Sequence, residues 1–127
     1  SKGDKGRHYC RYAILPHAEA FGAKSVIQPA YQFNYLPAQG FAAQEPLVSV
    51  DAANLMIEAV KPCEDAQKAY ILRIYDAAGD YTRAALRFGH EVKAVYECSM
   101  LEEEQRPADP ADLVFKPFEI KTIKVCY

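Results

Sequence analysis

Carboxylates are the most plentiful reactive groups of this sequence, with 17 Asp and Glu residues. Acid/base catalysis by a pair of carboxyl groups needs them held about 5–10 Å apart in a cleft. Glu58, Glu64 and Asp65 are the candidates, because they lie in an expected strand and in the turn that follows it. The alternative is structural: a strand glutamate pairs with a cross-strand lysine or arginine, and turn acids accept backbone hydrogen bonds. We favour the structural interpretation and predict no catalytic residue.

Histidine and cysteine are the usual ligands of zinc. His8, His17 and His90 are scattered and form no H-x-H or H-E-x-x-H unit. The four cysteines include no C-x-x-C pair, and their long spacings favour free thiols in a reducing compartment over disulfides. We therefore predict no metal ligand in this chain. We expect His17, which follows Pro16 at the end of an expected strand, to be a hydrogen-bonded anchor of its loop.

The aromatic residues include nine tyrosines and no tryptophan. Tyrosine rings are large and amphipathic, which suits them to recognition surfaces, including platforms on which sugars stack. In a small sandwich, strand tyrosines are also common as half-buried core residues. A stand-alone carbohydrate-binding module is therefore the alternative to a domain without a ligand of its own.

Length and charge exclude several classes of protein. The chain has 127 residues, the size of one domain, with a net charge of −2. This charge gives no attraction to nucleic acid or to an anionic membrane, and no run approaches the roughly 20 apolar residues of a membrane span. The sequence lacks an initiator Met, and we expect it to be a piece of a longer protein.

Alternation of apolar and polar residues predicts strands along most of the chain. The first expected strand covers residues 7–15. Further strands are expected over residues 54–61, 70–76, 81–88, 92–98 and 118–126, with a turn at 62–65, a hairpin loop at 77–80 and a bulge at 122–123. Short strands at this spacing predict an all-β fold, an antiparallel β-sandwich.

One segment has helical rather than strand spacing. Residues 25–36 carry apolar positions three and four residues apart, and Ser25 with Gln28 fits the capping-box pattern S-x-x-Q. We predict one short helix there, with connecting loops over residues 37–46 and 102–112.

Five sequence motifs, distributed over nearly the whole chain, indicate a more specific relationship. They are G-R-H-Y-C-R-Y-A-I-L-P-H at 6–17, A-Y-Q-F-N-Y-L at 30–36, I-E-A-V-K-P-C-E-D at 57–65 followed by I-L-R-I-Y-D-A-A-G at 71–79, V-K-A-V-Y-E-C-S-M-L-E-E at 92–103, and F-K-P-F-E-I-K-T-I at 115–123. Together they resemble the C-terminal β-domain region of glycoside hydrolase family 38, the α-mannosidases. The third motif is the most specific, similar to the family's I-E-A-V-K-P-A-E-D-G and I-L-R-L-Y-E-A-x-G. The departures, such as N-Y-L-P for N-x-P-L, concern loops.

The resemblance implies a non-catalytic accessory domain of a zinc-dependent, retaining α-mannosidase. In the family, the zinc ion and the aspartate nucleophile lie in an N-terminal domain whose motifs are not found here, so this chain alone is expected to be inactive. Its expected partners are the catalytic and middle domains of the same parent chain, and the parent's substrate is an α-mannoside. Glu64 and Asp65 become the candidate contact with the substrate cleft or with a neighbouring domain.

The resemblance also implies an organisation in three parts. Residues 1–17 form a strand of a larger preceding sandwich, residues 18–46 a helix and connecting loop, and residues 47–127 the C-terminal β-sandwich. The free-thiol interpretation of the cysteines favours a cytoplasmic enzyme.

Overall fold

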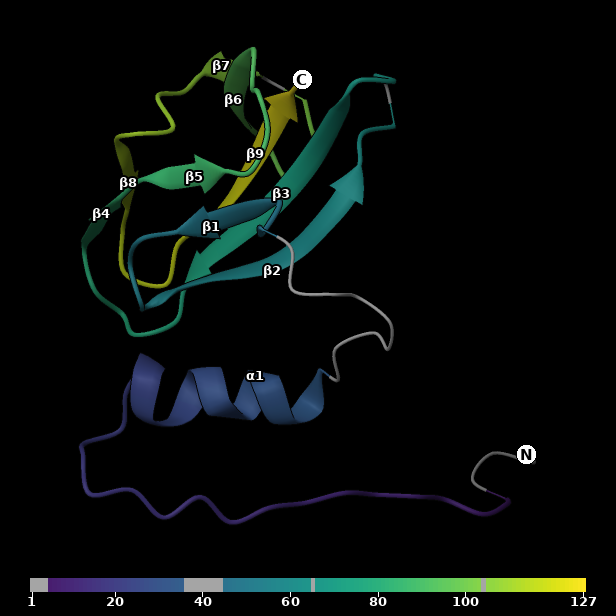
Figure 1. The fold of residues 1–127 in the computed structure, drawn as a ribbon, viewed down its shortest axis with the longest axis vertical. Coiled ribbons are helices and arrows are strands. Elements are labelled where there is room, and N and C mark those ends of the chain that lie inside the picture. Colours follow the sequence, from purple (N-terminus) through teal and green to yellow (C-terminus); the bar gives the residue numbers. More distant parts are fainter. Residues whose placement is uncertain (1–4, 36–44, 65, 104) are drawn as a thin grey trace.

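The computed structural model describes residues 5–35, 45–64, 66–103 and 105–127, and strands dominate it (Figure 1). A five-stranded antiparallel sheet contains, in spatial order, β2 (Leu55–Pro62), β3 (Ala69–Asp76), β9 (Ile120–Cys126), β6 (Ala94–Cys98) and β7 (Arg106–Pro107). Two small antiparallel sheets pair β1 (Val48–Val50) with β5 (Leu86–Phe88), and β4 (Thr82–Ala84) with β8 (Leu113–Phe115).

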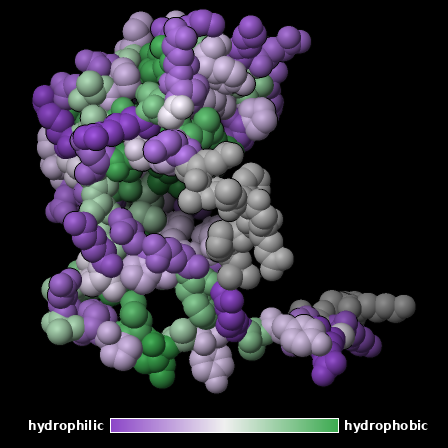
Figure 2. All heavy atoms as spheres, viewed as in Figure 1, coloured by the Kyte–Doolittle hydropathy of each residue, from purple (hydrophilic) through white to green (hydrophobic). Residues whose placement is uncertain are grey.

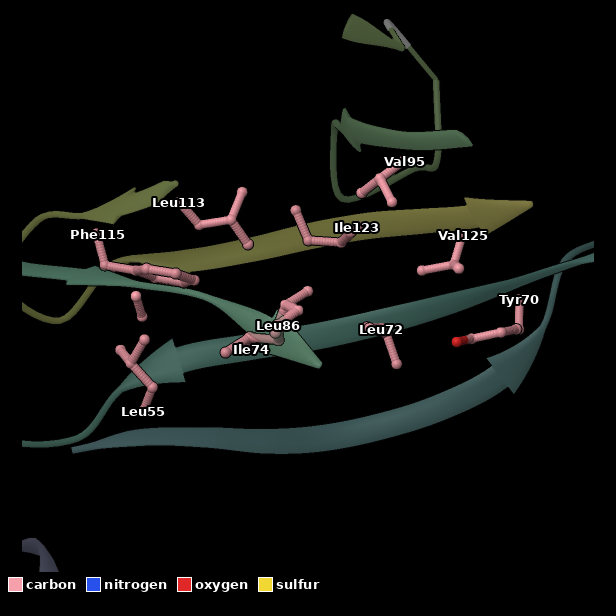
Figure 3. Close-up of a cluster of buried hydrophobic side chains, with 11 residues drawn as sticks. Leu55, Tyr70, Leu72, Ile74, Leu86, Val95, Leu113, Phe115, Ile123 and Val125 are labelled. Atoms are coloured by element: carbon pink, nitrogen blue, oxygen red, sulfur yellow. The ribbon is translucent and has the colours of Figure 1, made fainter. Parts of the chain in front are cut away.

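The hydrophobic core lies between the five-stranded sheet and the two small sheets. Leu72 and Ile74 of β3 and Ile123 of β9 contribute from the large sheet, and Leu86 of β5 and Phe115 of β8 from the small ones (Figure 3). Residues two apart in a strand point to the same face, so Leu72 and Ile74 enter the core together. Two layers packed around one core confirm the predicted antiparallel β-sandwich.

Strand β2 contains a bulge that local alternation does not predict. Its register with β3 shifts between Ile57 and Ala59, which leaves Glu58 without a partner in the ladder. Beyond the shift, Val60 pairs with the core residue Leu72, while Ala59 pairs with Arg73 on the opposite face. Simple alternation would place Ala59 on the same face as Leu55 and Ile57, but the extra residue reverses the faces beyond the bulge.

Strand β9 is regular, and the bulge predicted at residues 122–123 is wrong. Its pairing with β3 runs without a shift from Ala69–Cys126 to Tyr75–Ile120. Strict alternation then places Lys121 on the same face as Ile123, with its ammonium 5.7 Å from the centre of the Phe115 ring. The same alternation places Ile120 on the opposite face, where it is 55% exposed.

The predicted short helix is confirmed, but its capping is not. A π-helical turn, η1 (Ala23–Ile27), continues into α1 (Gln28–Asn34), and the helix lies beside β2 (Figure 1). Ser25 lies inside the helical segment rather than at its start, so its hydroxyl donates back to the carbonyls of Ala20 and Gly22. The expected capping box is therefore wrong.

Residues 7–15, the N-terminal arm, run alongside the helix without joining a sheet. They have no strand hydrogen bonding to other described residues, although the chain is drawn out below α1 (Figure 1). Arg11 attaches this segment to the helix, because its guanidinium donates to the carbonyl of Phe33 and lies over the Phe33 ring. The expected strand therefore has no partner among the described residues.

At two connections between strands, the structure differs from the prediction. Residues 77–80 do not join a hairpin, because β4 pairs with β8 while β3 pairs with β2 and β9. Residues 102–112, expected to be loop throughout, contain the short edge strand β7. The predicted loop over residues 37–46 lies almost wholly outside the described residues.

Candidate functional site

The turn of the β2–β3 hairpin holds the candidate loop at residues 62–65. Glu64 is exposed, and its carboxylate lies 3.4 Å from the ammonium of Lys61. Lys61 is also paired with Glu102, at 2.5 Å, and this hydrogen bond raises the pKa of the lysine. Asp65 lies outside the described residues. The described part of the turn therefore contains a surface ion pair rather than a pair of catalytic carboxylates.

A cavity of about 620 Å³ opens beside this turn. Its wall is formed by the ends of β2, β3 and β9 together with the segments before β1 and after β5. The lining is mainly apolar and aromatic: Leu47, Val60, Pro62, Tyr70, His90 and Tyr127. A concave, largely apolar site of this volume is typical of small-molecule binding.

Three rings form the aromatic wall of the cavity. The centres of Tyr70 and His90 are 5.7 Å apart, those of His90 and Tyr127 5.7 Å, and those of Tyr70 and Tyr127 5.9 Å. Tyr70 is buried, and burial raises the pKa of its hydroxyl to about 12. At physiological pH this hydroxyl stays neutral, 3.4 Å from Nε2 of His90. Of the tyrosines noted in the sequence, Tyr70 is therefore buried in the core, whereas Tyr127 is 44% exposed.

Glu58 has a structural partner, but not the expected lysine or arginine. The bulge in β2 leaves this carboxylate free to accept a hydrogen bond of 2.6 Å from the hydroxyl of Tyr31 in α1. The same hydroxyl lies 2.6 Å from that of Tyr75 in β3. These hydrogen bonds, with Glu58 first, raise the pKa of Tyr31 well above its ordinary range. Glu58 thus fixes the helix to the sheet.

Asp76 is a buried carboxylate that sequence reasoning missed. It is 1% exposed and accepts backbone hydrogen bonds from Gly79 and Phe118, at 2.7 and 2.9 Å, among others. The spacing of Asp76 and Gly79 is that of an Asx-type turn, the one local signal that could have identified the residue. Because its oxygens are occupied by the protein's own N–H groups, Asp76 organises loops and has no role open to a substrate.

The histidines do not come together. His17 Nδ1 lies 2.7 Å from the carbonyl oxygen of Glu19 within its own loop, and His90 belongs to the cavity wall. Among the described residues, no group of three or more His, Cys, Asp or Glu side chains is arranged to hold a metal ion. These residues therefore do not fit a zinc site. No helix in the described part of the chain is long and apolar enough to cross a membrane.

Comparison with known proteins identifies a family model and two longer proteins to which this chain is similar. Residues 54–123 match the family model described as the glycosyl hydrolases family 38 C-terminal beta sandwich domain. Human alpha-mannosidase 2C1 is 30% identical over 138 aligned positions, which cover 94% of this chain and 13% of the human protein. Mouse alpha-mannosidase 2C1 is 28% identical, with the same coverage of 94% and 13%. No solved structure matches the chain.

The family match begins within one residue of β2 and ends inside β9, so it spans the large sheet and most of its core. The two mannosidases extend the similarity over the N-terminal helix and arm, while the chain spans about an eighth of their length. The chain belongs to glycoside hydrolase family 38, and its sandwich is the C-terminal β-sandwich domain of that family.

Proposed function

We propose that this chain is a non-catalytic accessory part of a zinc-dependent, retaining α-mannosidase, and that it packs against and braces the catalytic domain of the parent protein. Its similarity to about 13% of two alpha-mannosidases supports an accessory role within a longer chain. Zinc belongs, in this proposal, to other domains of the parent, because the described side chains here do not fit it.

The observation that carries the proposal is the apolar surface of the N-terminal arm. Tyr12 and Ile14 are each 88% exposed, and Tyr9 and Phe21 nearby are 83% and 75% exposed. Apolar side chains in such a row are typical of a surface that a partner covers. Figure 2 shows apolar residues on this segment, at the bottom of the view, away from the sandwich.

The backbone of the arm supports the same conclusion. Residues 7–15 make no strand pairing with other described residues, so their N–H and C=O groups are available to a sheet edge. We therefore propose that this segment adds a strand to a sandwich that precedes it in the parent chain. Tyr12 and Ile14, two residues apart, would then enter the core of that sandwich together.

The test uses the full-length parent enzyme with the paired substitution Tyr12→Ser and Ile14→Ser. We expect a lower melting temperature and reduced hydrolysis of an α-mannoside, because the domains separate more readily. The matched control is Tyr81→Ser, which removes a side chain that is 72% exposed from the sandwich instead. Equal melting temperatures and equal activities for the two variants would overturn the proposal.

The hairpin turn is proposed as a second contact, with the substrate cleft or a neighbouring domain. Glu64 projects from this turn with 83% of its side chain exposed, so it is free to meet another surface. Replacing Glu64 and Asp65 with Ala in the parent enzyme should change KM if the turn reaches substrate, or thermal stability if it meets a domain. Unchanged kinetics together with unchanged stability would end this part of the proposal.

A cytoplasmic location is proposed on the state of the cysteines. Cys10, Cys63, Cys98 and Cys126 are all free thiols in the structure. Cys98 is partly buried, and burial raises the pKa of its thiol, which lowers its reactivity. The 127-residue chain is purified without a reductant, unfolded and titrated with a thiol reagent. Four thiols should be detected, and detection of fewer would favour an oxidising compartment.

A further inference from the structure

We propose that Phe118 is an anchor residue whose ring inserts into an apolar pocket on another domain of the parent chain. The inference rests on the proposed function, because it takes this chain to be part of a longer enzyme, and it adds a further contact at one end of the sandwich. Three observations carry it: the strained backbone of Phe118, the seat of its ring, and the connection of this end of the sandwich to the N-terminal helix.

The backbone of Phe118 has a conformation that favours glycine. Its φ is +58°, in the left-handed region, where a bulky residue is a rare outlier. The surrounding structure imposes this strain, because the buried carboxylate of Asp76 accepts from the Phe118 N–H at 2.9 Å and Glu119 accepts from the N–H of Lys116 at 2.7 Å. Glycine would occupy the position at lower cost. The contribution of Phe118 is therefore its ring.

The ring of Phe118 is exposed but firmly seated. It is 70% exposed and does not belong to the hydrophobic core. One edge lies against Gly79, where an added Cβ would be 2.6 Å from Cζ of the ring. This contact limits the motion of the ring, so little side-chain freedom remains to be lost on binding. An exposed aromatic ring held in this way is typical of the residues that dominate protein interfaces.

The surroundings of the ring define the chemistry of its partner. Pro117 is exposed beside it, and Ile120, two residues further on, is 55% exposed. Two exposed charges flank the contact between Phe118 and the turn after β3, and they are opposite in sign: Lys116 and Asp80. They cannot select a strongly charged surface of either sign. An apolar pocket is the surface that complements this end of the sandwich.

Hydrogen bonds join the same end of the sandwich to the N-terminal helix. The side chain of Gln28 in α1 donates to the carbonyl of Ala53, at 3.0 Å, and the adjacent Asn54 donates to Asp76, at 2.7 Å. Asp76 in turn holds Phe118. Figure 1 shows that the connection from β3 to β4 lies at the end of the sandwich that faces α1 and the arm. A domain that receives the arm would therefore also lie next to Phe118.

The occupant is assigned to the parent chain because of the length of the relatives. The chain spans 13% of the two alpha-mannosidases, so most of such a protein is available to supply the pocket. A second copy of this chain is the other candidate occupant. It would have to cover Phe118 in the isolated chain, whereas a pocket of the parent covers it only in the full-length enzyme.

Hydroxyl-radical labelling of the 127-residue chain and of the full-length parent distinguishes these cases, with a free peptide in each sample as the reference. We expect Phe118 to be oxidised readily in the chain alone and to be protected several-fold in the parent. Protection of Tyr12 without protection of Phe118 would overturn this inference and leave the proposed packing of the arm intact. Absence of protection at both residues would overturn both. Protection of Phe118 that appears in the chain alone as its concentration rises would identify a second copy instead.

Phe118→Gly separates a contact with the parent from a role inside the sandwich. In the 127-residue chain, the urea midpoint of this variant should be no lower than that of the native chain, because glycine adopts a φ of +58° without strain. In the full-length parent, the same variant should lower the melting temperature, because the anchor is lost.

The matched control is Leu101→Gly, which removes an apolar side chain that is 80% exposed and has no positive φ. It should affect the 127-residue chain and the parent alike. A lower midpoint of Phe118→Gly in the chain alone would show that the ring stabilises the sandwich itself. Equal melting temperatures of the two variants in the parent would show that no pocket holds the ring. Either result would overturn the assignment.

Discussion

The backbone N–H of Phe118 donates a hydrogen bond of 2.9 Å to Oδ2 of Asp76, a residue 42 positions earlier. The bond joins the end of β3 to the segment that leads into β9. The same oxygen accepts from the N–H groups of Gly79, at 2.7 Å, and Asp80, at 2.9 Å. The buried carboxylate of Asp76 thus sets the geometry of both the turn that follows β3 and the segment that precedes β9.

Asp76→Asn is expected to lower the free energy of unfolding by about 2–3 kcal/mol. The amide group would place N–H donors where the carboxylate now accepts, which leaves backbone donors without a partner. Urea unfolding followed by circular dichroism measures the change. Asp80→Asn is the control, because the Asp80 side chain is exposed and makes no hydrogen bond to another described residue. Equal unfolding midpoints for the two variants would contradict this role.

The stability of the domain should also fall in acid through Asp76. Burial by itself raises the pKa of this carboxyl, but hydrogen bonds from Phe118, Asn54, Ala78 and Gly79 outweigh it and hold the pKa below its ordinary value of 3.8. Because the folded pKa is the lower one, the stabilisation is complete above the unfolded pKa and is lost as pH falls through the folded value.

Unfolding free energies measured between pH 6 and pH 2 test this dependence. The native protein should lose more stability than Asp76→Asn below about pH 4, where the unfolded carboxyl binds its proton. Two parallel curves would show that other carboxyl groups account for the acid sensitivity.

Gly79→Ala should destabilise the turn after β3 by about 1–2 kcal/mol. Gly79 has a φ of +81°, which residues with a Cβ rarely adopt, and an added Cβ would lie 2.6 Å from Cζ of Phe118. Thermal unfolding measures the loss. Gly22→Ala is the matched control, since the nearest atom to its added Cβ is 3.6 Å away, at ordinary contact distance. A melting temperature equal to that of the control would be contrary evidence.

Tyr31→Phe should loosen the helix without unfolding the sandwich. The substitution removes the hydroxyl that bonds Glu58 and Tyr75, at a cost of about 1 kcal/mol for such a partly exposed pair. Hydrogen exchange should speed up in α1 and remain slow in β3 and β9. Tyr35→Phe is the control, because Tyr35 stacks on Tyr31 with ring centres 5.3 Å apart but its hydroxyl makes no hydrogen bond within the described part of the chain. Equal exchange rates in the two variants would exclude this attachment.

The sequence predicts the long strands of this fold well because their alternation is regular and local. Leu72 and Ile74 of β3 are two residues apart, so alternation places them on one face, and both lie in the core. The strands β1 and β8 have three residues each, too few for a period of two to show. Pairing between β4 and β8 depends on contacts across about 30 residues, which no local pattern encodes.

The candidate site was harder to predict, for the same physical reason. Glu58 and Tyr31 are 27 residues apart, and the expected partner of a strand glutamate is a cross-strand cation, so the tyrosine was not anticipated. The cavity brings His90 and Tyr127 to the hairpin turn, and their meeting depends on the packing of two sheets. The turn itself was identified from Pro62 and the acids that follow.

The bulge in β2 gives one residue control over how two parts of the chain are joined. Removing Glu58 would leave Ile57 and Ala59 paired in sequence with Ile74 and Arg73, so the ladder would become continuous and the sandwich would keep its core. The same deletion would remove the carboxylate that holds Tyr31. Loss of a single codon would therefore make the β2 ladder regular and at the same time weaken the docking of the helix, which would still be held by the hydrogen bond between Tyr31 and Tyr75 and by the one from Gln28 to the carbonyl of Ala53.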